Sequence, residues 1–78
     1  MAKAFCILVE VVDNDIDCWV YSSYEEAYEN LINKLHKAKE GLHPSEYEEE
    51  YSYNDGTAWF NNKKYNYCYY WQIFIREI

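Results

Sequence analysis

The strict alternation of side chains over residues 65–76 constrains the fold of this chain more than any other feature. Apolar and aromatic residues occupy the odd positions: Tyr65, Tyr67, Tyr69, Trp71, Ile73 and Ile75. The even positions carry a more polar mixture: Asn66, Cys68, Tyr70, Gln72, Phe74 and Arg76. A period of two over this length predicts a long β-strand, whose odd face packs against the rest of the core.

Other segments also have strand character. Residues 3–12 carry apolar side chains on both faces with one interruption, which is typical of a central strand. A polar turn over residues 13–17 leads into β-like residues 18–21, so these two strands are expected to form a hairpin. Residues 57–60 are predicted to form a short strand, which a turn over residues 61–64 joins to the last strand.

One helix is predicted over roughly residues 23–40. Apolar side chains recur there at steps of three and four residues: Tyr24, Ala27, Tyr28, Leu31, Ile32, Leu35, Ala38 and Leu42. Ser23 followed by Glu26, or Ser22 followed by Glu25, fits a capping box at its start. Acidic residues near the beginning and basic residues near the end suit the helix dipole.

These elements, in the order β-β-α-β-β, predict an α+β fold in which one helix packs on one face of a four-stranded sheet, antiparallel or mixed. Residues 1–78 are expected to form a single domain. Residues 43–56 are irregular, and a short helical turn or an edge strand fits them equally well. Because one helix covers only one face, the other should remain open, with Cys68, Tyr70, Phe74 and part of the first strand on it.

The charge balance restricts the kind of partner. The net charge is −7, from 14 acidic and 7 basic residues, so binding to nucleic acid or to an anionic membrane surface is disfavoured and a basic protein partner is expected. The apolar run near the N-terminus lacks the pattern of a signal peptide, and no apolar segment approaches the roughly 20 residues that span a bilayer. The predicted location is the cytoplasm, or the host cytoplasm if the protein is viral.

The three cysteines do not suggest a disulfide framework. Cys6, Cys18 and Cys68 are odd in number, and no two of them form a Cys-x-x-Cys pair. They are expected to be small, reduced residues on strands.

No catalytic residue, cofactor site or metal site is predicted. Asp13, Asp15 and Asp17 alternate like the first ligands of a calcium loop, but Cys18 and Tyr24 stand where that loop requires Gly and Glu. The two histidines have no partner at zinc-ligand spacing. The serines occupy capping positions and the two glycines occupy turns, so a nucleophile with its base and a phosphate loop are both missing, and the chain is expected not to be an enzyme.

The acidic, tyrosine-rich run over residues 46–55 is the most distinctive segment. It is interpreted either as a solvated loop or as an interaction surface. In the second case, tyrosines supply rigid amphipathic area and carboxylates complement Arg and Lys on a partner. Together with two residues of the open sheet face, the candidate partner-binding residues are Glu46, Tyr47, Glu48, Glu49, Glu50, Tyr51, Tyr53, Asp55, Tyr70 and Phe74.

Two short segments carry a resemblance to known proteins: Val20-Tyr21-Ser22-Ser23-Tyr24-Glu25-Glu26-Ala27 and Trp71-Gln72-Ile73. The pattern resembles one in small uncharacterised bacterial and phage proteins, where a strand passes through Ser-Ser into a Glu-Glu-Ala helix and the chain ends on a strand with Trp-x-Ile. The resemblance supports the fold and implies no activity.

The leading hypothesis is a small acidic binding or inhibitory protein that occupies a basic site on a nucleic-acid-handling host protein. A phage-encoded antagonist, acting as a nucleic-acid mimic or in the manner of an anti-CRISPR protein, would fit this description. The alternative is a self-associating structural or interaction module, such as a homodimer, that pairs through its open aromatic sheet face. A small enzyme or metal-binding domain is the third hypothesis.

Overall fold

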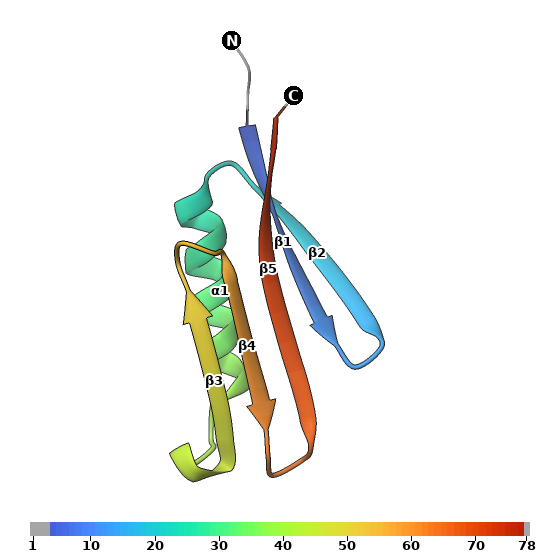
Figure 1. Cartoon of the computed structure of the whole chain (residues 1–78), viewed down its shortest axis with the longest axis vertical. Coiled ribbons are helices and arrows are strands. Elements are labelled where there is room, and N and C mark those ends of the chain that lie inside the picture. The colour runs from blue at the N-terminus through green and yellow to red at the C-terminus, as the bar shows by residue number, and fades with distance from the viewer. Residues whose placement is uncertain (1–3, 78) are drawn as a thin grey trace.

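The computed structural model describes residues 4–77. Its elements, in chain order, are β1 (Ala4–Val12), β2 (Asp15–Tyr21), α1 (Tyr24–Ala38), a 3₁₀ turn η1 (Pro44–Glu46), β3 (Tyr47–Ser52), β4 (Thr57–Asn62) and β5 (Tyr67–Glu77). The strands form one antiparallel sheet in the order β2-β1-β5-β4-β3, and α1 lies against one face, behind β3 and β4 in Figure 1. The fold is α+β, but the expected four-stranded sheet is wrong because the structure has five strands.

The additional strand comes from the irregular segment, which contains both of the structures expected as alternatives. Pro44 opens η1, and the Glu46 carboxylate accepts a hydrogen bond from the backbone N–H of His43 at 2.8 Å. The chain then enters β3, which pairs with β4 from Tyr47↔Asn62 to Ser52↔Thr57. Three consecutive glutamates have low intrinsic β propensity, so this strand depends on its pairing with β4 rather than on its own sequence.

The long alternating run forms β5, the middle strand of the sheet. It pairs with β1 from Ala4↔Glu77 to Val12↔Tyr69 and with β4 from Thr57↔Gln72 to Asn62↔Tyr67. β5 begins two residues later than the alternation suggested, because β4 is longer than expected and the connecting turn lies further along the chain.

That turn is fixed by two asparagines. Asn62 is buried, and its side-chain oxygen accepts a hydrogen bond from the Tyr65 backbone N–H at 2.9 Å. Asn66 adopts a left-handed conformation with φ of 58°, which asparagine tolerates better than most residues.

β1 lies between β2 and β5, as its apolar faces predicted. Lys3, expected as its first residue, lies outside the described residues. A two-residue turn at Asp13 and Asn14 leads into β2, which therefore starts earlier than the sequence pattern indicated.

The core lies between α1 and the sheet. Its largest fully buried side chains are Trp71, Phe60, Leu8, Leu31, Leu35 and Asn62. The Trp71 indole N–H donates to the Glu10 carboxylate at 2.8 Å, so the one polar group of the indole is satisfied. Glu10, the single interruption of the first apolar run, is thus the hydrogen-bond acceptor of the central tryptophan.

α1 lies where its periodicity predicted, with Ala27, Leu31 and Leu35 on its buried face. The Ser23 hydroxyl accepts a hydrogen bond from the Glu26 N–H at 3.2 Å and caps the helix. The Glu26 carboxylate accepts from the Ser22 hydroxyl at 3.1 Å instead of from the Ser23 backbone N–H, so only one half of the expected Ser23–Glu26 capping box forms.

Gly56 closes the turn between β3 and β4 in a crowded position. Its N–H donates to the Ser52 carbonyl at 2.9 Å, and its carbonyl accepts from the Ile73 N–H at 2.7 Å. Its φ is +65°, and a Cβ placed there would lie 2.8 Å from the Tyr24 hydroxyl oxygen. Gly41, which follows α1, also has a positive φ, of +81°, but a Cβ there would meet nothing within 4 Å.

The two glycines therefore allow a matched stability test. Gly41→Ala should lower the free energy of unfolding by about 1 kcal/mol, the cost of a left-handed alanine. Gly56→Ala should lower it by about 2 kcal/mol or more, because the added methyl also collides with Tyr24. Urea denaturation of both variants measures the difference, and equal losses would contradict the close packing at Gly56.

Candidate protein-binding surface

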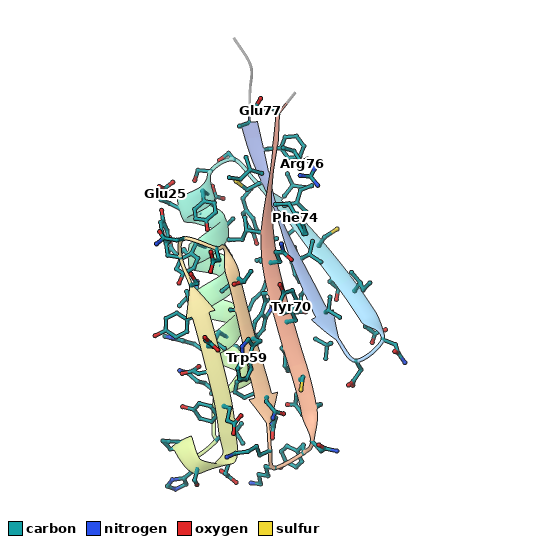
Figure 2. All side chains as sticks on the ribbon, viewed as in Figure 1. Glu25, Trp59, Tyr70, Phe74, Arg76 and Glu77 are labelled. Atoms are coloured by element: carbon teal, nitrogen blue, oxygen red, sulfur yellow. The ribbon has the colours of Figure 1, made fainter. Side chains whose placement is uncertain are left out.

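The face of the sheet opposite α1 carries no covering element among the described residues, and we call it the open face. Its apolar side chains come from four strands: Phe5, Ile7, Val9, Val11, Ile16, Val20, Trp59, Tyr70 and Phe74. Ile16 and Val20 are 70% and 67% exposed, and Tyr70 is 42% exposed. Figure 2 shows Tyr70 and Phe74 along β5. A contiguous apolar area of this extent is typical of an interaction surface.

One row of side chains crosses the open face from an acidic end to an apolar end. The strand register places Glu50 opposite Trp59, Trp59 opposite Tyr70, Tyr70 opposite Val11, and Val11 opposite Ile16. Cross-strand neighbours on one face lie about 5 Å apart, so these side chains form a continuous band. The surface therefore combines an aromatic centre, an aliphatic side at β2 and a carboxylate at β3.

Polar contacts border this band along β5. The Tyr70 hydroxyl donates to the Gln72 side-chain oxygen at 3.1 Å. The Arg76 guanidinium lies 5.4 Å from the centre of the Phe74 ring. It places one positive charge on the open face near the C-terminal end of β5. Of the residues predicted for the open face, Tyr70 and Phe74 lie there, and so does the exposed Cys68.

The acidic, tyrosine-rich run does not form one patch, because β3 sends its side chains alternately to the two faces. Glu48 and Glu50 lie on the open face, whereas Tyr47, Glu49 and Tyr51 lie on the helix side. Glu49 binds the Lys39 ammonium at 2.8 Å, and Tyr47 packs against Phe60 with ring centroids 5.4 Å apart. Tyr51 remains 56% exposed at the edge of that side.

Lysines lie beside further carboxylates of the run. Glu46 lies 3.6 Å from Lys64, and Glu48 lies 3.8 Å from Lys63. The hydrogen bond from the His43 backbone, assisted by the Lys64 charge, holds the pKa of Glu46 below its ordinary value. Together with the Lys39 pair, these contacts leave Glu50 and Asp55 as the carboxylates of the run without an ion pair among residues 4–77.

Glu50 and Asp55 line the same shallow depression. Its volume is about 180 Å³, and its lining is completed by Tyr51, Ser52, Thr57 and Trp59. The Trp59 side chain is 36% exposed. Two uncompensated carboxylates beside an exposed indole are the groups that bind an Arg or Lys side chain, through ionic hydrogen bonds and a cation–π contact.

Tyr53 ties the β3–β4 turn to the start of α1. Its ring makes edge-on contacts with Tyr24 and Tyr28, at centroid distances of 5.1 and 4.8 Å, and its hydroxyl donates to Glu25 at 3.3 Å. The Tyr24 hydroxyl in turn donates to the Tyr53 carbonyl. Tyr53 therefore has a structural role, whatever its part in binding.

The sequence interpretation missed Trp59, Ile16 and Val20 as surface residues. Trp59 alternates with Ala58 and Phe60, which are buried, so the period of two in β4 could have indicated that it faces outward. Ile16 was assigned to a turn, and its place on the open face depends on the early start of β2.

The described residues contain no cluster of three or more side chains able to hold a metal ion, and Asp15 and Asp17 lie on β2. Cys6 is buried, which raises the pKa of its thiol, while Cys18 and Cys68 are exposed and unbridged. Within residues 4–77, no helix combines the length and the apolarity needed to cross a membrane.

No family model, curated protein or solved structure matches the chain. The resemblance to bacterial and phage proteins therefore stays a prediction.

The tyrosine cluster and the Lys39–Glu49 pair predict a loss of stability at alkaline pH. Burial raises the pKa of Tyr24 and Tyr28 above the ordinary value of 10.0, and the hydrogen bond to Glu49 raises the pKa of Lys39 above 10.5. The unfolded chain then releases these protons at lower pH than the folded one. Their contribution is complete below about pH 10 and is lost as the pH rises through the folded-state values.

Urea midpoints at pH 8 and at about pH 10.5 measure this effect. Tyr28→Phe should reduce the difference between the two midpoints, since it removes one of the shifted groups. Tyr65→Phe, in the exposed β4–β5 turn, is the matched control. An unchanged midpoint of the unmodified protein across this interval would contradict the prediction.

Proposed function

We propose that this chain is a protein-binding module that docks its open sheet face on a basic surface of a partner protein. The observation that carries the proposal is the row from Glu50 through Trp59 and Tyr70 to Val11 and Ile16. It supplies apolar area for burial and, at one end, free negative charge for orientation. Protein interfaces combine an aromatic-rich centre with a polar rim in this way.

The distribution of charge supports a basic partner. The net charge of −7 attracts a positive surface over long range and raises the rate of encounter. At close range, within residues 4–77, Glu50 and Asp55 have no competing lysine, whereas Glu46, Glu48 and Glu49 are already paired. The depression beside Trp59 is therefore the place where we expect an Arg or Lys of the partner to insert.

A basic surface that normally holds nucleic acid is the simplest target of this kind. Occupying it would block the nucleic acid and make the chain an inhibitor. The antagonist hypothesis, including a phage origin and an anti-CRISPR role, belongs to this proposal and depends on the identity of the partner.

The test is a pull-down of tagged protein from host lysate at low and at high salt, analysed by mass spectrometry. The site variant combines Glu50→Gln, Asp55→Asn and Trp59→Ala. The control variant combines Glu29→Gln and Glu40→Gln, two exposed carboxylates at α1 and just beyond it. A genuine partner should be retained by the unmodified protein and the control at low salt, and lost at high salt or with the site variant.

Calorimetry with the recovered partner then gives the magnitude. Each lost charge-assisted contact should weaken binding by about tenfold or more. Equal retention by all three proteins would reject the site. Recovery of the bait alone, as a multimer, would instead favour self-association through the open face.

A further inference from the structure

β2 is an outer strand of the sheet, and its side chains on the open face are apolar and exposed. Its outward-facing backbone groups have no strand partner among the described residues. Its open-face side chains Ile16, Cys18 and Val20 are all exposed, and its two charged residues, Asp15 and Asp17, lie on the helix side. The opposite edge, β3, carries three consecutive glutamates, a common device against edge-to-edge pairing. The two edges of the sheet are therefore unequal.

We propose that β2 is a self-association edge, at which a second copy of this chain adds its own β2 antiparallel to form one continuous sheet. A two-fold axis perpendicular to the sheet produces this arrangement, and it keeps both open faces on the same side. Opposed residues of an antiparallel pair point to the same face of the sheet. The axis must therefore lie between the two copies of one residue, which then face each other. The proposal does not rest on the partner-binding role, since Trp59 and Glu50 lie at the other end of the row.

The register follows from the composition of the strand. Cys18 is the midpoint of β2, so an axis through Cys18 pairs every residue from Asp15 to Tyr21. On the open face this register sets Ile16 against Val20 of the other copy, which covers the two aliphatic side chains that are most exposed within residues 4–77. Opposed apolar pairs of this kind stabilise antiparallel sheets.

Charge complementarity on the helix side selects the same register. Centring on Cys18 sets Asp17 against Trp19 of the second copy. The Lys34 ammonium lies 3.6 Å from the centre of the Trp19 ring, so each Asp17 carboxylate meets a lysine across the interface. An axis through Asp17 would oppose two carboxylates, and one through Trp19 would bring the two Lys34 side chains together. Both alternatives place like charges side by side.

Oxidative cross-linking tests the register directly. Opposed antiparallel residues have Cα atoms about 4.5–5.5 Å apart, within the range that a disulfide requires. In a Cys68→Ser background, diamide should convert the protein to a covalent dimer: the two Cys18 S–H bonds break, one S–S bond forms, and diamide takes up the two electrons and two protons. In a Cys18→Ser background, the exposed Cys68 is the matched control and should yield little dimer. Equal cross-linking in both backgrounds would reject the register.

Sedimentation equilibrium under reducing conditions tests the interface without the thiols. Val20→Lys should raise the dimer dissociation constant by about tenfold or more, since symmetry places the substitution in the interface twice. Tyr70→Lys, on the open face away from β2, should leave it unchanged. Asp17→Lys should weaken the dimer, and adding Lys34→Asp should restore it. A monomer at all concentrations, or loss of association only with Tyr70→Lys, would overturn the proposal.

Discussion

The packing of Trp71 on the central strand is the contact on which the rest of the structure depends. β5 pairs with β1 over residues 69–77 and with β4 over residues 67–72. Trp71 lies fully buried on its helix-facing side, with its indole N–H bound to Glu10. Glu10 comes from β1, and Ala58, opposite Trp71, comes from β4. One side chain thus connects the N-terminal hairpin to the C-terminal strands. This contact adds to the ladder between β1 and β5 and to the buried Cys6 and Leu8 of β1, which also hold the β1–β2 hairpin to the core. Isolated hairpins are marginally stable in water.

The same architecture explains why so much apolar surface remains outside. A single helix of 15 residues can cover only one face of a five-stranded sheet. A small domain buries a limited fraction of its surface, so residues that serve stability alone should gather under that helix. Nine apolar side chains lie on the opposite face, outside the core. Glu10, by contrast, lies on the helix side, where its carboxylate accepts a hydrogen bond from the Trp71 indole. Selection for stability alone would favour polar residues at Ile16, Val20 and Trp59, and their exposure is part of the support for the proposed binding role.

The sequence alone predicted the elements that have a clear local periodicity. It did not predict the elements and contacts that depend on residues far away in the chain. The period of two in β5 and of three to four in α1 predicted both elements and placed Tyr70 and Phe74 on the open face. β3 was left open because Glu48, Glu49 and Glu50 form a strand only beside β4. The division of the acidic run followed from lysines that no local pattern connects to it: Lys39 from the end of α1, and Lys63 and Lys64 from the β4–β5 turn. The free charge of Glu50 and Asp55 could be recognised only after those pairs were known.

The two proposed surfaces are centred on opposite ends of the same row of side chains, and this separation has a consequence for how a dimer would bind. The acidic depression belongs to the β3–β4 edge, while self-association would use β2, so the two surfaces share only Ile16, at the far end of the row. A dimer joined at β2 would present two acidic depressions on one side of one continuous sheet, facing the same way. Binding of the first would hold the second close to the partner, so a repetitive basic target would be held more tightly than one copy could hold it. Unequal edges, one with three consecutive glutamates and one with exposed Ile16 and Val20, would in this way set both the number of copies and the spacing of their binding sites.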